Sequence, residues 1–443
     1  MKRRLRRYLA GIGAAGLSLI LTAAGGPTAT AAHAVTLHPA LEHAPHIYTG
    51  STVPPTTASC QARSHINCYG PQQFAVAYGL TKAFAAGDTG KGRTIAIVDS
   101  FGSPTIEADL ATFDRDFGIK PPPSFRIIQP VGAVTFDAGN STEIGWAQET
   151  TLDVEYAHAF APDANILLVE TPTAETEGVV GFPDIVAAEN YVIDHDLADV
   201  ITQSFGATED TFDSPQQLLE QRSAFVNAAR HNVTVLGSSG DAGATDAIFD
   251  GSADYPYRVN SWPSADPLVT SVGGTQLHLD AAGHRTSPDV VWNDGYGAGG
   301  GGVSKVFARP SYQDNVMNVV GTHRGTPDIS MSAAVDGGAL VYYSFVPGSV
   351  GYHIFGGTSE ASPQLAGVVA LLDQAAGRRV GQLNPLLYAA GATHQPSIVD
   401  VTSGDNSFDG VVGYPATQGY DLASGWGTLD VGTLIQQVTS LLH

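Results

Sequence analysis

Between residues 93 and 237, short β-branched segments alternate with amphipathic helical segments, and this alternation is the strongest indication of fold in the 443-residue chain. Such alternation indicates βαβ units, in which successive strands lie parallel in one sheet. We expect strands at residues 93–98, 125–131, 165–170, 200–204 and 233–237, and helices at residues 105–117, 143–160, 183–195 and 215–231. The sequence therefore predicts an α/β fold with a mainly parallel central sheet flanked by helices, in one large domain.

Polar residues follow three of these expected strands. They are Asp99, the stretch 204–206 and the stretch 238–241. Functional residues of open parallel sheets gather at the carboxyl ends of the strands, so we expect these residues to meet at one edge.

Ser359 lies in the segment Phe-Gly-Gly-Thr-Ser-Glu-Ala-Ser-Pro, residues 355–363, just before a strongly helical run. A hydroxyl at a helix N-terminus is close to free backbone amides and to the positive end of the helix dipole, which favour developing negative charge. Ser359 is therefore a candidate nucleophile, provided that a partner accepts its proton. The alternative is that Ser359 or Thr358 only caps the helix.

We do not expect a histidine to accept the proton of Ser359. The chain has no His-Gly pair, and His158, His195 and His231 lie on expected helices or at their ends, where we interpret them as surface or packing residues. Glu149 and Asp153 are instead four residues apart on the expected helix 143–160 and share one of its faces. Two neighbouring carboxylates raise the pKa of one of them and suit acid/base work in acid. The alternative is a solvated acidic face.

Three further acidic residues are to be compared with this pair. Glu143 and Glu155 lie on the same helix but away from the face of Glu149 and Asp153, so we do not assign them to the site. Asp241 ends the strand Thr-Val-Leu-Gly-Ser-Ser-Gly-Asp and points to the same edge of the sheet. Taken alone, Asp241 is equally compatible with an ordinary turn residue.

The longer string Gly-Thr-Ser-x-Ala-x-Pro-x-x-Ala-Gly around Ser359 resembles the serine segment shared by subtilisins and sedolisins. The Glu-x-x-x-Asp helix and the Ser-Gly-Asp strand end resemble the sedolisin (serine-carboxyl peptidase) family, and the resemblance covers about residues 69–432. It implies a subtilisin-like fold and a secreted endopeptidase that is active in acid, at around pH 3–5. It implies a catalytic set of Glu149 as base, Asp153 as its partner, Asp241 as protonated oxyanion donor and Ser359 as nucleophile.

The resemblance also implies supporting residues. Backbone at Ser204, Gly206, Gly300 and Gly301 is expected to bind substrate, and Asp99 is either part of the carboxylate network or a strand-end residue. One structural Ca²⁺ is expected in the tail, with ligands Asp400, Val401, Thr417, Gly419 and Asp421. Carboxylates and carbonyls in Gly-rich turns suit that hard cation. An acidic loop without metal is the alternative.

The N-terminal sequence predicts export. Residues 1–34 combine a basic start, an apolar run and a small-residue exit, which together are typical of a signal peptide and too weak for a membrane anchor. Residues 35–68 lack periodicity and are expected to be an extended segment, too short for the long prodomain of the family, before a peptidase domain at residues 69–443. Cys60 and Cys68 are able to close a small loop in an oxidising compartment.

Without residues 1–34, the chain has 16 basic and 43 acidic residues, a formal net charge of −27. Such a charge repels nucleic acids. We therefore expect a secreted monomer that acts on polypeptides, binds no nucleic acid and does not enter a membrane after signal removal. Two rival hypotheses are a subtilisin-type peptidase that uses Asp99 and an unrecognised histidine, and a non-catalytic peptide-binding protein on a peptidase scaffold.

Overall fold

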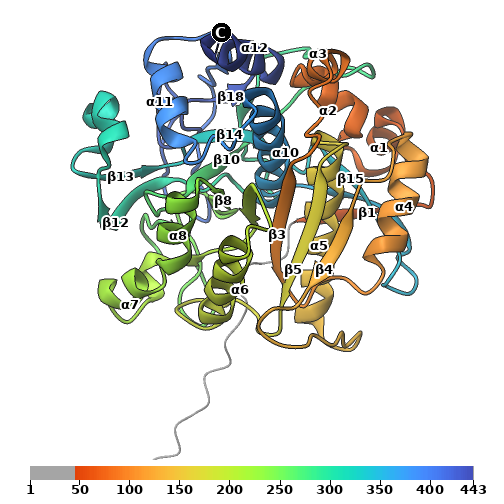
Figure 1. Ribbon diagram of the computed structural model, residues 1–443, viewed down its shortest axis with the longest axis horizontal. Helices are drawn as coiled ribbons and strands as arrows, with labels where there is room; N and C mark the ends of the chain where they lie inside the picture. The colour runs from red at the N-terminus through yellow and green to blue at the C-terminus, as the bar shows by residue number, and fades with distance from the viewer. Residues whose placement is uncertain (1–44, 443) are drawn as a thin grey trace, which may run out of the picture. The chain divides into compact units, whose positions relative to one another are not determined.

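The computed structural model describes residues 45–442, so the expected signal peptide lies outside the described residues. The described chain is built on an eight-stranded sheet in which strand β3 (Thr94–Ser100) is central (Figure 1). The order is β11-β10-β8-β6-β3-β5-β4, and β14 also pairs with β10. Every pairing in this sheet is parallel except that of β10 with β11. The expected mainly parallel α/β sheet is confirmed.

The other strands of this sheet are β4 (Phe125–Ile128), β5 (Asn165–Thr171), β6 (Val200–Gln203), β8 (Thr234–Ser238), β10 (Thr270–Gln276), β11 (Val290–Val291) and β14 (Ile329–Ser332). The main helices are α4 (Ile106–Phe117), α5 (Ser141–Phe160), α6 (Phe182–Asp194), α7 (Pro215–Glu220), α8 (Ser223–His231), α10 (Thr358–Ala376), α11 (Asn384–Ala392) and α12 (Val431–Leu442).

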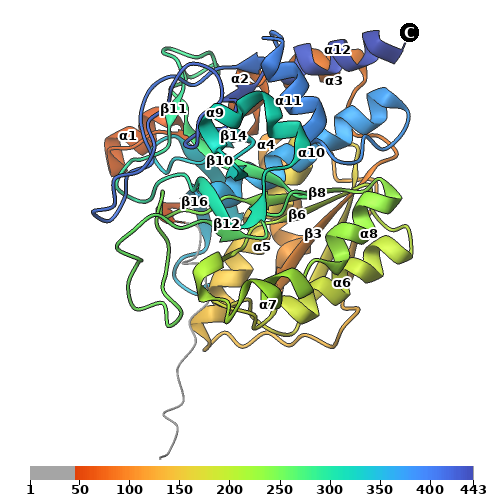
Figure 2. The ribbon, with the colours of Figure 1, turned by 90° about the vertical axis from the view of Figure 1, so that its left-hand side faces the viewer.

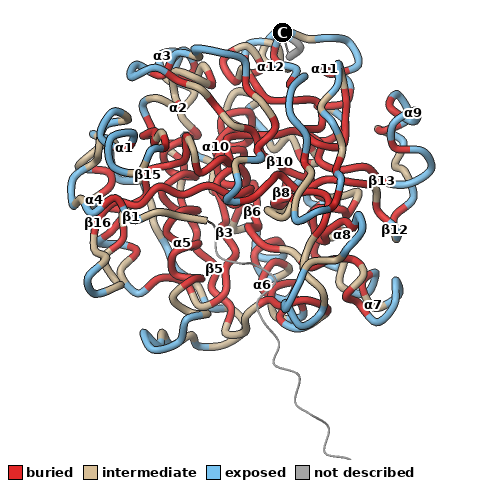
Figure 3. Tube along the Cα trace, turned by 180° about the vertical axis from the view of Figure 1, so that it is seen from behind, coloured by how far each residue is buried: buried red, intermediate tan, exposed pale blue. Residues whose placement is uncertain are grey.

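Side chains of β3 alternate between two cores, as a strand buried on both faces requires. Ile95 and Ile97 belong to the core that includes α5 and α10. Ala96 and Val98 belong to the core formed with α6 and α8. Figure 2 shows strands β3, β6 and β8 between α10 on one side and α6 with α8 on the other. Figure 3 shows that α5 and α10 are buried along most of their lengths.

The stretch up to residue 68 is not simply an extended segment, which corrects our expectation. Strand β1 (His46–Ser51) pairs with β16 (Gly351–Phe355), and helix α1 (Thr57–Ser64) follows it. Together with β15 (Gly338–Tyr343) and β2 (Cys68–Tyr69), these strands form a four-stranded sheet in the order β1-β16-β15-β2. The folded domain therefore begins before residue 69, because a strand 300 residues away along the chain orders this segment.

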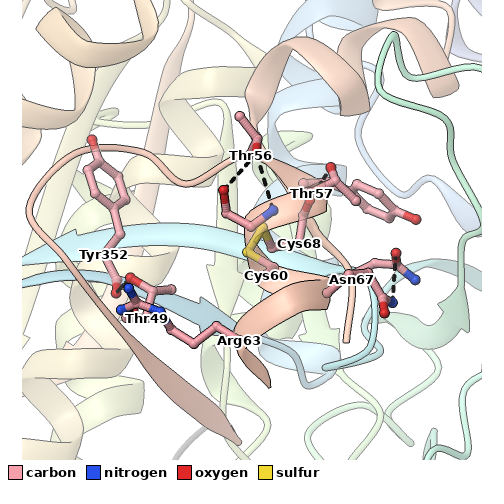
Figure 4. The surroundings of a disulfide bond; sticks show 12 residues. Thr49, Thr56, Thr57, Cys60, Arg63, Asn67, Cys68 and Tyr352 are labelled. Atoms are coloured by element: carbon pink, nitrogen blue, oxygen red, sulfur yellow. Dashed lines mark hydrogen bonds between the residues drawn. A yellow bond between two sulfur atoms is a disulfide. The ribbon is translucent and has the colours of Figure 1, made fainter. Parts of the chain in front are cut away.

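A disulfide joins Cys60 on α1 to Cys68 on β2, as the spacing of the two cysteines allowed (Figure 4). Neighbouring bonds anchor the same segment: Thr49 Oγ1 donates to the Tyr352 carbonyl at 2.6 Å, and Thr57 Oγ1 donates to the Cys68 carbonyl at 2.9 Å. Arg63 donates to the Thr49 carbonyl. The N-terminal strand is thus held against β16, the strand that leads to Ser359.

The expected helix 215–231 is two helices, α7 and α8, with a break at Gln221 and Arg222. Arg222 turns its guanidinium to the buried carboxylate of Asp266, with Nη2 2.9 Å from Oδ1, and the break allows this pair to form.

The remaining elements are short helices and strands around this frame: α2 (Pro71–Ala77), α3 (Leu80–Ala86), α9 (Met317–Val320), β7 (Ala207–Thr208), β9 (Ser261–Trp262), β12 (Gly302–Ala308), β13 (His323–Thr326), β17 (Ile398–Val399) and β18 (Thr428–Leu429), with one-turn helices at Glu209–Thr211 and Ser311–Val316. Within residues 45–442, no helix has the length and apolar character that crossing a membrane requires.

Candidate active site

Ser359 lies in the first turn of α10, immediately after β16 and the pair Gly356-Gly357. Gly357 has φ +95°, and a Cβ at this position would lie 2.6 Å from Asp241 Oδ2. Only glycine combines this backbone angle with such a close approach. The turn therefore brings the start of α10 directly against Asp241, and Ser359 Oγ makes no hydrogen bond to a described residue.

Asp241 follows β8, at the carboxyl edge of the sheet. Its Oδ1 accepts hydrogen bonds from Thr358 N at 2.7 Å and Thr358 Oγ1 at 2.8 Å, while its Oδ2 has no hydrogen-bond partner among the described residues. Burial raises the pKa of Asp241 to about 6, although the two bonds from Thr358 lower it. Asp241 therefore holds a proton in acid, and Oδ2 is the oxygen left to carry it.

Helix α5 holds Glu149 and Asp153 one turn apart and buried, with 2% and 0% exposure. It packs closely on α10, where a Cβ at Gly367 would lie 2.4 Å from Phe160 Cβ. Ser204, just after β6, joins the two helices: its hydroxyl donates to Asp153 Oδ1 at 3.0 Å and lies 3.5 Å from the Ser359 carbonyl. Asp153 and Ser359 thus lie on either side of one hydroxyl.

The pKa of Asp153 is held well above its usual range by burial and by the charges of Asp99 and Glu149, whereas the bond from Ser204 opposes this shift. Asp99 is the second-last residue of β3, is fully buried, and has its pKa raised to about 7 by desolvation. Its charge is one of the causes of the raised pKa of Asp153, and its part in a carboxylate network stays a prediction.

Glu155 is also on α5 but is engaged away from Glu149 and Asp153, as the spacing predicted. It is fully buried and accepts a hydrogen bond from Tyr342 N at 3.1 Å. Glu143 lies at the exposed start of the helix and accepts from Asp137 N and Asn140 Nδ2. Neither carboxylate joins the group around Ser359.

A cleft of about 800 Å³ opens beside Asp241 and Thr358. Gly206 and Phe205, both from the stretch 204–206, line it. Ser204 is not among the lining residues, and its hydroxyl is engaged with Asp153. The expected contact of the Ser204 backbone with substrate stays a prediction.

Gly300 and Gly301 are not among the residues that line the cleft, and their expected contact with substrate stays a prediction. Gly300 N donates to the Gly240 carbonyl at 2.7 Å, and a Cβ at Gly300 would lie 2.1 Å from the Ser239 carbonyl. A Cβ at Gly301 would similarly lie 2.2 Å from the Leu422 carbonyl. Gly300 therefore packs against the backbone of the segment that leads to Asp241.

One histidine does line the cleft. His46, on β1, stacks on Phe355 with ring centroids 4.6 Å apart, and its Nε2 lies 3.3 Å from Gln148 Nε2. The sequence offered no signal for it, because its place depends on the pairing of β1 with β16. His46 is therefore the histidine on which a subtilisin-type mechanism would have to rest.

The two carboxylates among the expected calcium ligands contact the same loop of the tail. Asp400 Oδ2 accepts from Gly419 N at 2.9 Å, and Asp421 Oδ2 accepts from Thr417 N at 2.8 Å, so both carboxylates contact the loop 417–419. Val401 directly follows Asp400. The set of two carboxylates and nearby carbonyls fits a hard cation. Within residues 45–442, no group of three or more His, Cys, Asp or Glu side chains is arranged to hold a metal, so backbone carbonyls would supply the other ligands.

The sequence matches the Subtilase family over residues 135–414. Kumamolisin from Bacillus sp. (strain MN-32) is 33% identical over 371 residues, covering 81% of this chain and 62% of that protein. Sedolisin from Pseudomonas sp. (strain 101) is 30% identical over 398 residues, covering 87% and 63%. The chain thus spans less than two thirds of the length of these curated relatives.

A solved structure of Pseudomonas sedolisin, a serine-carboxyl proteinase complexed with two molecules of pseudo-iodotyrostatin, superposes with a TM-score of 0.74. It is 30% identical, and the match covers 85% of this chain and all of that one. The chain belongs to the sedolisin family of serine-carboxyl peptidases, within the subtilisin-like fold.

Proposed function

We propose that this protein is a secreted, acid-active serine-carboxyl endopeptidase. One observation carries the proposal: Asp241 is bonded to Thr358, directly before Ser359, and keeps one buried oxygen without a partner. Such an oxygen, when protonated, is a hydrogen-bond donor aimed at the place where negative charge develops during acyl transfer. Family membership supports the same reaction class.

In the proposed reaction, Ser359 Oγ attacks a peptide carbonyl carbon while Glu149 takes the hydroxyl proton. Protonated Asp241 donates to the oxyanion of the tetrahedral intermediate. The intermediate collapses, the C–N bond breaks, and Glu149 returns the proton to the leaving amine. In the second half of the reaction, water attacks the acyl carbon while Glu149 takes its proton. The bond between the acyl group and Ser359 Oγ then breaks, and Glu149 returns the proton to Ser359.

Asp153 positions Glu149 in this scheme. Its raised pKa leaves it protonated in acid, and Glu149 is the member of the pair that serves as the base in this proposal. Asp99 adds repulsion that keeps the proton on Asp153. The charge arrangement around Ser359 therefore favours an acid optimum.

We also propose one structural Ca²⁺ bound by Asp400 and Asp421 with the carbonyls of Val401, Thr417 and Gly419. Burial raises the pKa of Asp421, the opposite of what an anionic ligand needs, and a bound cation would offset that penalty. The chemistry of this ion would be structural, because the tail loops hold none of the residues assigned to the reaction.

The decisive experiment is a pH–activity profile on a mixed peptide library. The unsubstituted protein should cleave best at around pH 3–5. Ser359→Ala and Glu149→Gln should each lower kcat by about 10³-fold or more, since one removes the nucleophile and the other the base. Glu143→Gln is the matched control on the same helix and should retain full activity.

The rivals give different results. Full activity of Ser359→Ala would end the proposal. A neutral-to-alkaline optimum, tolerance of Glu149→Gln and loss of activity in His46→Gln would establish a subtilisin-type mechanism instead. Binding of peptides without cleavage, and without labelling of Ser359 by a peptide aldehyde, would establish a non-catalytic binding protein.

A further inference from the structure

Strand β1 brings to the cleft a histidine that the proposed reaction does not use. His46 is half-buried and lines the cleft together with Pro45. The Pro45 carbonyl accepts a hydrogen bond from Gly356 N at 3.0 Å, three residues before Ser359. The cleft end of β1 therefore borders the turn that carries the proposed nucleophile, and a movement of this end would change the cleft.

A chain of hydrogen bonds runs from His46 into the core. Nε2 of Gln148 lies 3.3 Å from His46 Nε2 and donates to Tyr343 Oη at 2.9 Å. Tyr343 Oη lies 3.1 Å from His353 Nδ1, and His353 Nε2 lies 2.9 Å from the Ser349 carbonyl. Gln148 on α5, Tyr343 on β15 and His353 on β16 are buried, so bonds to water do not readily replace these contacts.

The donors and acceptors of this chain have one consistent direction. A carbonyl oxygen only accepts, so His353 Nε2 carries the hydrogen that it donates to Ser349. Burial lowers the pKa of His353 to about 3, so the ring is neutral and its Nδ1 accepts the hydroxyl hydrogen of Tyr343. Tyr343 accepts from Gln148, and the amide nitrogen of Gln148 is also directed at His46 Nε2. This last contact is a hydrogen bond only while His46 Nε2 has no proton.

A proton on His46 Nε2 makes the contact with Gln148 repulsive, because both nitrogens then carry hydrogens at a separation of 3.3 Å. Gln148 is not able to turn its amide in response. Its Oε1 would face Tyr343 Oη, whose hydrogen is already donated to His353. The whole chain reverses only if His353 also takes a proton, and burial opposes that step until the pH falls to about 3. Above that pH, the chain and a protonated His46 Nε2 are incompatible.

The other groups near His46 favour its protonation. The titratable residues on the elements around it and in the cleft are Tyr48 on β1, Glu149 on α5, Tyr343 on β15, His353 on β16 and Asp241. His46 also stacks on Phe355, with ring centroids 4.6 Å apart. Ionised carboxylates and the face of an aromatic ring both stabilise a charged imidazole. Gln148 is therefore the neighbour that opposes a proton on His46 Nε2.

Only the cleft end of β1 depends on this contact. Further along the strand, Thr49 Oγ1 donates to the Tyr352 carbonyl at 2.6 Å, and Arg63 donates to the Thr49 carbonyl (Figure 4). The disulfide between Cys60 and Cys68 holds the segment that follows. A change at His46 is thus confined to the residues before Thr49.

We propose that Gln148 and His46 form a pH-sensitive latch on the cleft end of β1. While His46 is neutral, the latch holds residues 45–48 against β16. When His46 gains a proton, the latch opens and these residues loosen, whereas the rest of β1 stays in place. Acid then changes the cleft through β1 as well as through Asp241. The inference goes beyond the proposed peptidase function and does not depend on it.

NMR spectra of the full-length protein with isotope-labelled histidine test the direction of the chain. At neutral pH, His353 should carry its hydrogen on Nε2 and His46 should carry its hydrogen on Nδ1. As the pH falls, His46 should gain its second proton at Nε2 while His353 stays neutral. The opposite tautomers at neutral pH, or a charged His353 there, would overturn the proposal, and this result needs no variant that has to fold.

Amide hydrogen exchange measures the loosening itself. Between pH 7 and pH 4, exchange of residues 46–48, divided by the intrinsic rate at each pH, should increase by about tenfold or more. Exchange of residues 49–51 should stay the same. His46→Phe keeps a ring against Phe355 but takes no proton, so its exchange should be equal at both pH values. His195→Phe is the matched control, because His195 is an exposed histidine that stacks on Tyr191 on α6, and it should keep the increase.

Gln148→Met tests the latch from the other side. It removes the amide that faces His46, so exchange of residues 46–48 should again be equal at both pH values. No increase in the unsubstituted protein would overturn the proposal, as would the full increase in a folded His46→Phe or Gln148→Met, with thermal melting as the measure of folding. Neither measurement needs a substrate, so a failure of the peptidase function would leave this test unchanged.

Discussion

Buried carboxylates in this molecule are of two kinds, which Asp328 and Asp241 represent. Asp328, after the hairpin strand β13, forms a double ion pair with Arg324, at 2.7 and 2.5 Å, and both side chains are fully buried. It also accepts from Tyr388 Oη at 2.9 Å and Ser271 N at 2.8 Å. Among residues 45–442, no lysine or arginine forms an ion pair with Asp241, Asp153 or Asp99.

The two kinds differ in how their charge is compensated. A buried carboxylate with a bidentate arginine stays ionised and holds neighbouring elements in place. A buried carboxylate without a cation gains a proton, and here its pKa moves toward or above 6. Asp241, Asp153 and Asp99 are of the second kind, and so are Glu155 and Glu189 elsewhere in the described core, so burial alone is enough to hold protons near Ser359.

The largest test of this comparison is to convert the first kind into the second. Arg324→Met leaves Asp328 buried without its cation, and we expect the free energy of unfolding at neutral pH to fall by about 3–5 kcal/mol. A buried carboxylate that has lost its cation favours its neutral form, so the loss should be largest where carboxylates are ionised and should shrink as the pH falls.

Denaturant unfolding at pH 7 and pH 4 measures both quantities. The loss should be smaller at pH 4. The double variant Arg324→Met with Asp328→Asn is the control, because it removes the charge and should recover part of the stability. An equal loss at both pH values would contradict the assignment of Asp328 as a charge held by its arginine.

Asp421 is an intermediate case and gives the next test. Its Oδ1 accepts from Ala423 N and Ser424 N, each at 2.9 Å, and no arginine pairs with it among the described residues. If Ca²⁺ supplies the missing charge, then removing calcium with a chelator should destabilise the protein. The expected loss is about 2.7 kcal/mol relative to a calcium concentration one hundred times the Kd.

Thermal melting with and without calcium checks this expectation, with Asp421→Asn as the variant that should no longer respond. Magnesium at the same concentration is a useful control, because it prefers six ligands in a smaller octahedral site. If calcium does not change the melting temperature, Asp421 belongs instead to the second kind, the buried carboxylates that have no cation and gain a proton.

The contrast between local and long-range information also explains what the sequence predicted. Strand β3 and helix α5 were expected within two residues of their observed ends, because hydrophobic periodicity is a local signal. The meeting of Asp241 with the turn before Ser359 followed from the parallel order of the strands. The position of β1 did not follow, because its partner β16 is some 300 residues away.

Loops account for the other differences. Gly300 packs against the backbone at Ser239 and Gly240, and only tertiary packing reveals that contact. Sequence spacing predicts which edge of the sheet a loop starts from, but not which side chain of that loop enters a cleft.

The smallest expected effect tests the proton on Asp241 itself. In the unsubstituted protein, activity should fall as the pH rises through about 6, because Asp241 loses the proton with which it donates to the oxyanion. Asparagine donates through its amide at any pH. Asp241→Asn should therefore remove the fall near pH 6. Above this pH, kcat/KM of the unsubstituted protein should decrease by at most about tenfold per pH unit, and kcat/KM of the variant should decrease less steeply. Glu143→Gln, which changes a carboxylate at the start of α5 outside the site, should keep the fall and serves as the control. The same fall in Asp241→Asn would mean that another group, with Asp99 as the first candidate, carries the proton that activity requires.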